Sequence, residues 1–453
     1  MSARLLLGGT RSGCGKTSFT CALLRAWGQA GVRLASCKSG PDYIDPLFHR
    51  SVLGTKSCNL DLFFTNSDTT RGLLRQHSAG CDLTVLEGAM GYYDGIALSS
   101  EASAWDLARV TETPAVLVVD ARGAAASLCA EVEGFVRHRP DSGLRGVLLN
   151  RVSPMLYPRL RALIRERCAV EVFGFLPPLP QCAFESRHLG LMTPAELTGL
   201  NEKLDVLAEN ARKYVDLDAL LALARTAPPL EGPALSLPEP VPGRPVVAVA
   251  RDRAFCFHYE ENFALLEALG AEIRTFSPLN GEGLPPCDAL WLGGGYPEVH
   301  AAALSENRSL WAQIRAAVAD GLPTVAECGG FLCLQSALET EEGVRWPMAG
   351  VFPGVGRPVG KLRRFGYVTL TAQGDSLLLR AGETIPAHEF HYWDVDDPGA
   401  DFSAQKPQSD RGWRCVHAEP GLYAGFPHLY LYSNPTMARR LLLAALRHRE
   451  ERR

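Results

Sequence analysis

The sequence predicts an α/β protein of two domains, the first built on a doubly wound parallel sheet. Two observations predict this fold. Short apolar runs alternate with longer stretches of helical pattern, and a proline-rich segment interrupts the alternation. The 453 residues are also too many for one ordinary hydrophobic core. We therefore expect domains over residues 1–227 and 245–453, joined by a linker over residues 228–244.

Apolar runs of strand length mark the expected sheets. Those before the linker are rich in leucine and β-branched residues, which suits strands buried on both faces of a parallel sheet. The segments between them fit crossover helices. We expect residues 362–432 to form a β-rich extension or cap. The predicted strands are residues 4–8, 33–37, 83–87, 115–120, 146–150 and 172–176, then 246–250, 272–276, 289–292 and 324–326, with a helix near 262–269.

Composition narrows the class of protein. The chain is 46% hydrophobic and 21% charged with a net charge of −4, which favours neither nucleic-acid nor membrane-surface binding. No apolar run approaches the roughly 18 residues of a membrane-spanning helix. The 13 cysteines are scattered, without a C-x-x-C pair or zinc-like spacing, so no disulfide framework or metal site is predicted from them. We expect a cytoplasmic protein, and a homodimer is compatible with the sequence.

A glycine-rich turn follows the first predicted strand and precedes a helix expected to start near Ser18. Backbone N–H groups of such a turn surround phosphate oxygens at a helix N-terminus. We expect it to bind ATP, with Lys16 reaching the β- and γ-phosphates and Thr17 coordinating Mg²⁺. A turn that only packs a helix is the alternative, disfavoured because strand, loop, Lys-Thr and helix occur in order. The expected ATP-binding residues of this turn are Gly9, Thr10, Ser12, Gly13, Cys14, Gly15, Lys16 and Thr17.

Acidic and amide residues follow other predicted strands. Asp42 and Asp45 come after the second strand, where carboxylates can hold a metal or a charged substrate, although turn or helix-cap roles are common for such residues. Glu87 ends the third predicted strand, the position of a second Mg²⁺ ligand beside a phosphate loop. We expect Thr17, Asp42 and Glu87 to bind the metal. Asn150 ends the fifth predicted strand and is either an adenine contact or a turn residue.

A cysteine ends the last predicted strand and is followed by two glycines. This arrangement fits a sharp strand-to-helix turn that exposes a nucleophile, and the helix N-terminus favours the thiolate of Cys328. Gly294 and Gly295, together with Gly329, supply backbone N–H groups for an oxyanion hole, although glycines also form ordinary tight turns. The base is left open among three histidines. They are His428, His388 and His391.

With these motifs placed, the chain resembles the cobyrinic acid a,c-diamide synthase family over nearly its full length. The resemblance implies a dethiobiotin-synthetase-like ATPase followed by a class I glutamine amidotransferase, with Cys328 as nucleophile and His428 as base. The family usually has H-x-H where this chain has His428, Leu429 and Tyr430, which implies a Cys–His dyad. The motifs are GTRSGCGKT at 9–17, KSGPDYIDP at 38–46, EGAMGYYDG at 87–95, RHLGL at 187–191, ARDRAFCFHY at 250–259, FSPL at 276–279, GGGYPE at 293–298, AECGG at 326–330 and HEFHY at 388–392.

The resemblance also implies a reaction. ATP and glutamine would serve to amidate the a and c carboxylates of cobyrinic acid, a corrin-type tetrapyrrole, through an acyl phosphate. Hydrogenobyrinic acid and nickel-sirohydrochlorin are alternative substrates for the same chemistry. A different class, a P-loop switch ATPase with a non-catalytic amidotransferase module, is disfavoured because Cys328 is retained. Residues expected to position the substrate are Lys38, Tyr43, Asp45, Asp94, Arg187 and His188.

Overall fold

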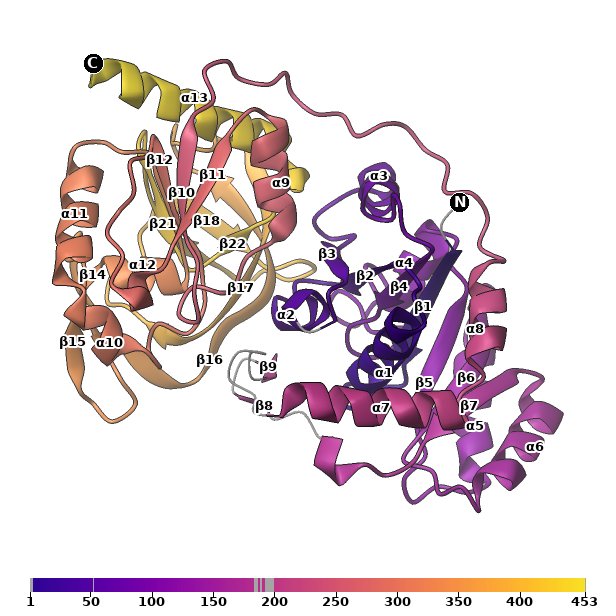
Figure 1. Cartoon of the computed structure of the whole chain (residues 1–453). Coiled ribbons are helices and arrows are strands. Elements are labelled where there is room, and N and C mark those ends of the chain that lie inside the picture. Colours follow the sequence, from indigo (N-terminus) through magenta and orange to yellow (C-terminus); the bar gives the residue numbers. More distant parts are fainter. Residues whose placement is uncertain (1–2, 52, 183–185, 188–189, 192–198, 453) are drawn as a thin grey trace. The chain divides into compact units, whose positions relative to one another are not determined.

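The computed structural model divides into two compact units, Met1–Leu235 and Ser236–Arg453 (Figure 1). It describes residues 3–51, 53–182, 186–187, 190–191 and 199–452. The division falls inside the proline-rich segment. Within the described residues, no helix combines the length and the apolar character needed to cross a membrane.

The N-terminal unit contains a seven-stranded parallel sheet in the order β3-β2-β4-β1-β5-β6-β7. Every residue of β1, β4 and β5 is buried, as expected for strands covered by helices on both faces. The predicted parallel α/β fold is therefore confirmed. The strands are β1 (Ala3–Gly9), β2 (Leu34–Ser39), β3 (Lys56–Leu60), β4 (Leu83–Glu87), β5 (Ala115–Asp120), β6 (Leu144–Asn150) and β7 (Glu171–Leu176), with the small pair β8 (Ser186–Arg187) and β9 (Gly190–Leu191).

Helices connect these strands in alternation (Figure 1). Local signals set several of their starts. The side chain of Asn66, for example, accepts a hydrogen bond from the backbone N–H of Thr69 and caps α3. The helices are α1 (Lys16–Gln29), α2 (Ile44–Ser51), α3 (Ser67–His77), α4 (Ala104–Val110), α5 (Ser127–Arg137), α6 (Tyr157–Cys168), α7 (Leu200–Tyr214) and α8 (Leu217–Ala224).

Strand β3 was missed by the sequence analysis. Its sequence, KSCNL, mixes polar and apolar residues because it forms the edge of the sheet and has a strand partner, β2, on one side only. The strand ending at Glu87 is consequently the fourth of the chain, and the one ending at Asn150 is the sixth.

The C-terminal unit begins with a second α/β sheet, in the order β11-β10-β12-β13-β21-β20, in which only β20 is antiparallel to its neighbour. The sheet places the ends of β12, β13 and β21 side by side. Its strands are β10 (Val246–Ala250), β11 (Glu272–Phe276), β12 (Ala289–Leu292), β13 (Thr324–Glu327), β20 (His417–Glu419) and β21 (Leu422–Gly425). The helices of this unit are α9 (Glu260–Ala268), α10 (Ala301–Glu306), α11 (Arg308–Ala319), α12 (Gly329–Leu334) and α13 (Pro435–Glu451).

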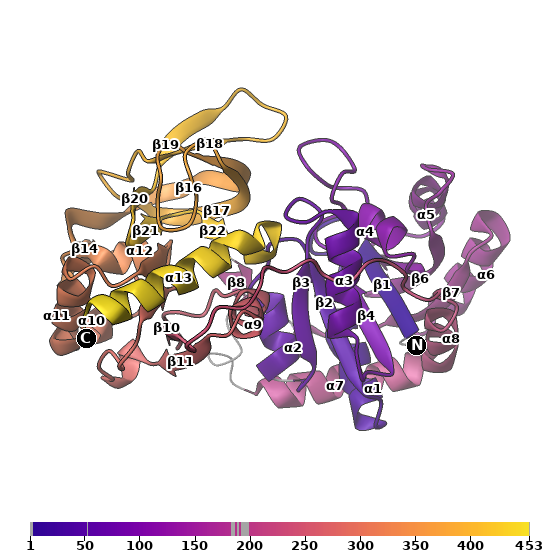
Figure 2. The same ribbon diagram turned by 90° about the horizontal axis from the view of Figure 1, so that it is seen from above.

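A further, mostly antiparallel sheet completes this unit (Figure 2). It confirms the expectation of a β-rich segment over residues 362–432. Its last pairing sets His388 opposite His428 in register, which brings two histidines distant in sequence side by side. The strands are β14 (Gln335–Glu339), β15 (Arg345–Pro347), β16 (Phe352–Ala372), β17 (Thr384–Asp394), β18 (Phe402–Gln405), β19 (Gly412–Cys415) and β22 (His428–Leu429).

Candidate active sites

The loop between β1 and α1 has the shape of a phosphate-binding turn. Gly13 and Gly15 have φ angles of +73° and +109°, and a Cβ atom on Gly15 would lie 2.0 Å from Nδ2 of Asn150. That amide, at the end of β6, donates to the carbonyl of Cys14 at 2.9 Å. Asn150 therefore supports the loop from the end of β6, and its contact with adenine stays a prediction.

The ammonium group of Lys16 is held inside this loop. Its Nζ donates to the carbonyl oxygens of Arg11 at 3.1 Å and of Met90 at 2.5 Å. Burial lowers the pKa of Lys16, and the nearby charge of Lys38 acts in the same direction. Phosphate oxygens offered at this place would replace neutral carbonyl acceptors with charged ones, which hydrogen-bond more strongly.

An acidic centre lies where β1, β4 and β2 end together. Glu87 is fully buried, and its Oε1 accepts a hydrogen bond from Oγ1 of Thr17 at 2.7 Å and another from Nζ of Lys38 at 3.0 Å. Burial opposes ionisation of Glu87, but the charge of Lys38 helps to outweigh it, and the pKa of Glu87 is lowered. Two of the three predicted metal ligands, Thr17 and Glu87, are thus in direct contact.

The residues at this centre fit Mg²⁺. Within the described chain, Oε2 of Glu87 is buried and makes no hydrogen bond, although Nε2 of His49 lies 3.5 Å from it. A carboxylate oxygen with spare capacity beside a hydroxyl is the hard oxygen donor set that this ion prefers.

Asp42 and Asp45 have different surroundings. Oδ1 of Asp42 accepts hydrogen bonds from the backbone N–H groups of Ile44 at 2.9 Å and Asp45 at 3.1 Å, the turn role considered for it from the sequence. Oδ2 of Asp45, in contrast, lies 2.5 Å from Nζ of Lys38, and both side chains are buried. The structure therefore joins Asp45 to Glu87 through Lys38, whereas Asp42 shapes the start of α2.

The remaining predicted substrate residues are spread more widely. Tyr43 is buried. Asp94 is exposed, and its Oδ2 accepts from the backbone N–H of Gly91 at 2.8 Å. Arg187 belongs to β8, and His188 lies outside the described residues.

Sequence reasoning missed two features near the loop. His49 is completely buried against Glu87, and its signal was only its position three residues after the Asp45–Pro46 pair. Asp120, which ends β5 at the same edge, anchors Arg151 at 2.7 Å and lies 3.8 Å from Arg11. These arginines place positive charge beside the phosphate loop.

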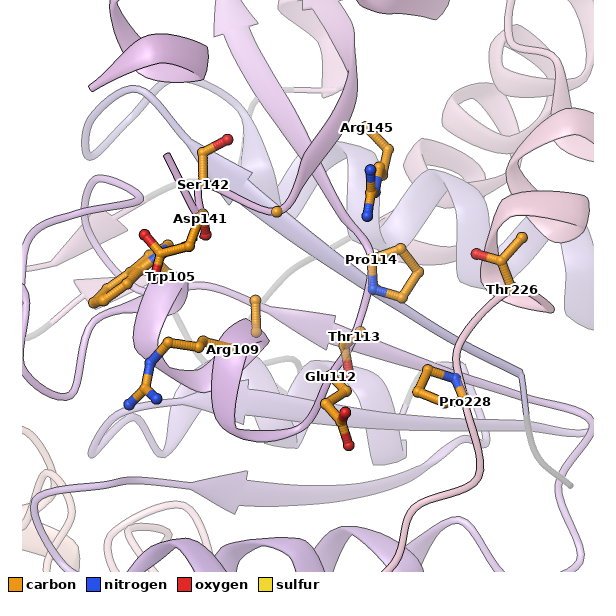
Figure 3. A pocket seen from close by; sticks show the side chains of 12 residues that line it. Trp105, Arg109, Glu112, Thr113, Pro114, Asp141, Ser142, Arg145, Thr226 and Pro228 are labelled. Atoms are coloured by element: carbon orange, nitrogen blue, oxygen red, sulfur yellow. The ribbon is translucent and has the colours of Figure 1, made fainter. Parts of the chain in front are cut away.

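A cavity of about 280 Å³ lies in the N-terminal unit, away from these groups (Figure 3). Pro114 and Gly143, which line it, directly precede β5 and β6. The cavity is therefore at the amino ends of the strands, whereas the phosphate loop is at their carboxyl ends. Ligands of open parallel sheets bind at the carboxyl ends, so this cavity is not the expected catalytic site.

In the C-terminal unit, Cys328 joins β13 to α12 in a strained conformation. Its φ and ψ are 47° and −102°, which L-residues rarely adopt. The backbone N–H donates to the carbonyl of Gly425 at 2.8 Å, and Sγ lies 3.9 Å from the carbonyl of Phe390. A strained, well-anchored cysteine between strand and helix is the arrangement of a nucleophile turn.

The predicted oxyanion residues converge beside this turn. A Cβ atom on Gly294 would lie 2.4 Å from Cε1 of His428, and one on Gly329 would lie 3.2 Å from the backbone nitrogen of Gly295. Gly295 itself has φ of +155°. Gly295 therefore lies close to Gly329, the residue after Cys328, and Gly294 lies against the ring of His428.

Glu327, which the sequence analysis overlooked, faces the base. Its Oε2 lies 3.8 Å from Nδ1 of His428, and its Oε1 accepts from the backbone N–H of Leu429 at 2.9 Å. Burial raises the pKa of Glu327 to about 8 and lowers the pKa of His428 to about 3. His428 is thus neutral near pH 7 and able to accept a proton.

The expectation that the helix N-terminus favours the Cys328 thiolate is wrong for this structure. Burial raises the pKa of the thiol, and the nearby acids Glu298 and Glu389 raise it further. The backbone N–H of Gly329, at the start of α12, lowers this pKa, but by less than burial and the two acids raise it. Ionisation of the thiol therefore depends on transfer of its proton to a base.

The two other candidate bases, His391 and His388, lie in different surroundings from His428. Nε2 of His391 lies 2.9 Å from Oε1 of Glu389, Nδ1 lies 2.5 Å from the carbonyl of Trp393, and the ring stacks on Phe426. Both nitrogens of His391 are therefore engaged. His388 lies next to His428, and burial lowers its pKa to about 3. Of the three, His428 combines closeness to Gly294 with an acidic neighbour.

Comparisons with known proteins agree with this division of sites. Residues 5–189 match the CobQ/CobB/MinD/ParA nucleotide binding domain, and residues 246–433 match the CobB/CobQ-like glutamine amidotransferase domain. The chain is 36% identical to a cobyrinate a,c-diamide synthase of Caldanaerobacter subterraneus, with 96% of this chain and 97% of the relative covered. The relative of that name from Salmonella typhimurium is 36% identical, with 99% and 100% covered, and that from Gloeobacter violaceus is 38% identical, with 98% and 97% covered.

Similarity at this level over whole chains cannot come from one shared domain alone. The phosphate loop with Glu87 and the Cys328 turn with His428 each lie inside one matched region. The chain therefore belongs to the cobyrinate a,c-diamide synthase family, as a glutamine-dependent amidating ligase.

Proposed function

We propose that this protein uses ATP and ammonia derived from glutamine to convert the a and c carboxylates of cobyrinic acid into primary amides. The observation that carries the proposal is the presence, on one chain, of a phosphate loop contacting Glu87 and a strained Cys328 whose preceding residue, Glu327, faces His428. The names of the relatives support the choice of substrate. We expect the enzyme to act in the cytoplasm.

We assign the ATP-dependent step to residues 1–227 and glutamine hydrolysis to residues 245–453, with residues 228–244 as the linker. A carboxylate is a poor electrophile and ammonium is a poor nucleophile. Each reactant therefore needs activation before the amide bond can form, and two domains on one chain provide the two activations.

Ammonia would be released by covalent catalysis. Sγ of Cys328 attacks the side-chain amide carbon of glutamine while His428 accepts the thiol proton and passes it to the leaving ammonia. Water then hydrolyses the glutamyl thioester to glutamate. The backbone N–H groups of Gly294, Gly295 and Gly329 would stabilise the oxyanion.

Glu327 completes this proposal as a positioning residue. When ionised, as the pH rises through its raised pKa of about 8, the carboxylate held by Leu429 would stabilise the imidazolium that His428 becomes after proton transfer. It would therefore do the work of the third residue of a triad, at a position the chain's Tyr430 does not supply. The ring of Tyr430 packs edge-on against Tyr259.

In the N-terminal unit the γ-phosphoryl group of ATP would pass to a substrate carboxylate, giving an acyl phosphate and ADP. Ammonia would then displace phosphate. Lys16 and the loop amides would hold the phosphates. Thr17 and Glu87, with Asp42 as the predicted third ligand, would hold Mg²⁺, which supplies charge neutralisation to the phosphates. The predicted substrate-positioning residues remain Lys38, Tyr43, Asp45, Asp94, Arg187 and His188.

The test is to incubate the pure protein with ATP, Mg²⁺, glutamine and cobyrinic acid and to follow the product mass. A Cys328→Ala variant is compared with and without added ammonia. We expect the wild type to add two amides and the variant to do so only with ammonia, because its amidoligase site is intact.

The other outcomes discriminate between the alternatives. Amidation of hydrogenobyrinic acid or nickel-sirohydrochlorin, with cobyrinic acid untouched, would change the substrate and keep the mechanism. Failure to amidate any of these tetrapyrroles, even with ammonia, would contradict the proposal and favour the P-loop switch ATPase.

A further inference from the structure

A cluster of soft ligand atoms lies in the N-terminal unit and shares no residue with either proposed site. It comprises Cys37 on β2, Cys58 on β3 and His77, the last residue of α3. Cys37 and Cys58 are paired in register between the two strands, and their Sγ atoms are 2.9 Å apart. One ligand atom from each of the three residues lies within 4.8 Å of the other two. The residues are far apart in sequence, which is why ligand spacing did not predict the cluster.

The cluster is separate from the acidic centre. Successive residues of a strand point to opposite faces of the sheet, so Cys37 and its neighbour Lys38 face opposite ways. Lys38 contacts Glu87 and Asp45, whereas Cys37 faces the side on which α3 carries His77. A ligand bound by the cysteines would therefore not touch the ATP site.

The environment suits a thiophilic cation. Cys37 and Cys58 are almost completely buried and His77 is half-buried, with its Nε2 atom buried, so the cluster is shielded from bulk water. Two thiolates and one neutral imidazole would offset the charge of a divalent ion and leave a fourth position for water.

We propose that Cys37, Cys58 and His77 form a binding site for a soft divalent metal ion of the Zn²⁺ class. Binding releases two protons, one from each thiol, and forms two metal–sulfur bonds and one metal–nitrogen bond. With metal–sulfur bonds of about 2.3 Å in a tetrahedral site, the two sulfur atoms would be about 3.8 Å apart, so they must separate by about 0.9 Å from their present 2.9 Å. His77, at a helix end, is able to follow such a shift.

A metal at this place would act as a structural clip. It would join the edge strand β3 to β2 and to the end of α3. The segment between β2 and β3 carries Asp45 and His49, so ion binding should stabilise the scaffold of the acidic centre without taking part in chemistry. The expected effect is a higher melting temperature of the metal-loaded protein.

The test uses Cd²⁺ as a spectroscopic probe in the full-length Cys328→Ala variant, which removes the predicted nucleophile as a competing thiol. Under reducing conditions we expect one Cd²⁺ per chain, an ultraviolet thiolate-to-cadmium absorption band, and release of two protons per ion. Additional Cys37→Ser and Cys58→Ser substitutions should abolish the band, and His77→Gln should weaken binding at least about tenfold.

Cys168→Ser is the matched control. Cys168 is also buried next to a second cysteine, with Sγ 3.5 Å from the carbonyl of Cys129, but the pair belongs to no His-containing cluster within the described residues. This variant should bind Cd²⁺ like its parent. Unmutated protein gives a check that does not depend on variants folding, because Zn²⁺ should protect Cys37 and Cys58 from alkylation in a peptide map.

Two results would overturn the proposal. One is the absence of stoichiometric Cd²⁺ binding together with unprotected alkylation of both cysteines. The other is a Cys37–Cys58 disulfide in the isolated protein that, once reduced, still binds no metal, which would assign the pair to redox chemistry.

Discussion

The two candidate sites lie at the same kind of place, the carboxyl edge of a parallel sheet, but they are electrostatic opposites. In the N-terminal unit, Glu87, Asp45 and Lys38 are buried, and Lys38 contacts both carboxyl groups. In the C-terminal unit, Cys328 and His428 are buried with pKa values shifted toward their neutral forms.

This difference follows from the chemistry proposed for each site. Phosphoryl transfer is accelerated by fixed charges that are in place before the reactants arrive, and such charges persist in a protein interior only when paired. Cysteine catalysis instead begins with a proton transfer between two neutral groups and creates charge only during the reaction. The predictions below test this contrast, starting with the largest expected effect.

Lys16→Met should remove amide synthesis with either nitrogen source. Losing a cation that stabilises the transferring phosphoryl group costs on the order of 10²–10³-fold or more in rate. Hydrolysis of glutamine alone should continue, as measured by glutamate release. Cys328→Ala is the reciprocal control, and loss of glutamine hydrolysis in Lys16→Met would show that the two sites are not chemically independent.

Asp45→Asn should destabilise the N-terminal unit. The variant removes one of the two carboxyl groups that face the buried Lys38. Because burial raises the pKa of Asp45 against the effect of Lys38, the cost should be at most about 3–5 kcal/mol, the cost of breaking a buried ion pair. Denaturant unfolding, followed by a probe in the N-terminal unit, measures the change. Asp82, which forms an exposed ion pair with Arg33, gives the control. Asp82→Asn should destabilise the protein far less. Equal losses of stability in the two variants would show that burial does not raise the cost of breaking the ion pair.

Glu327→Gln should slow glutamine hydrolysis about 10²-fold with little change in KM for glutamine, because the amide still accepts from Leu429 but cannot stabilise a charged His428. Synthesis from ammonia should be unchanged. Tyr430→Phe is the matched control and should be close to wild type. The reverse pattern, a defect in Tyr430→Phe only, would assign the orienting role to Tyr430.

The pH dependence of glutamine hydrolysis should reveal the same carboxyl group. Because burial raises the pKa of Glu327 to about 8, the group is protonated at pH 7 and becomes a carboxylate as the pH rises through that value. The rate of glutamine hydrolysis by the wild type should therefore rise as the pH passes through about 8, by a few fold to about tenfold. Glu327→Gln should lack this step, and a profile unchanged by the substitution would attribute the rise to the thiol of Cys328 instead.

Asn150→Ala should have the smallest effect. It removes one hydrogen bond to the carbonyl of Cys14, worth about 1 kcal/mol, or about a fivefold weaker affinity for ATP. Binding of ATP and GTP compared in both proteins identifies the residue's role. An equal loss for both nucleotides indicates support of the loop, whereas loss of discrimination between them indicates adenine contact.

Local sequence patterns were sufficient for much of the fold. The predicted strands fall on β1, β2, β4 to β7 and β10 to β13, because continuous apolar runs bounded by glycine and polar residues have few other stable conformations. Strand β3 was not predicted, because its sequence mixes polar and apolar residues and lacks such a run. His49 was missed because it lies just outside the motif at 38–46. Glu327 lies inside the motif at 326–330, but the local sequence does not show that its side chain faces His428.

The sequence by itself determined where the phosphate loop and the nucleophile turn lie, since each is a contiguous strand–turn–helix segment. Only the tertiary structure decided that Asp45 rather than Asp42 contacts Lys38, that Glu327 faces His428, and that burial raises the pKa of the Cys328 thiol. The physical reason is that these properties depend on strand order and desolvation, which arise from contacts between residues distant in the chain.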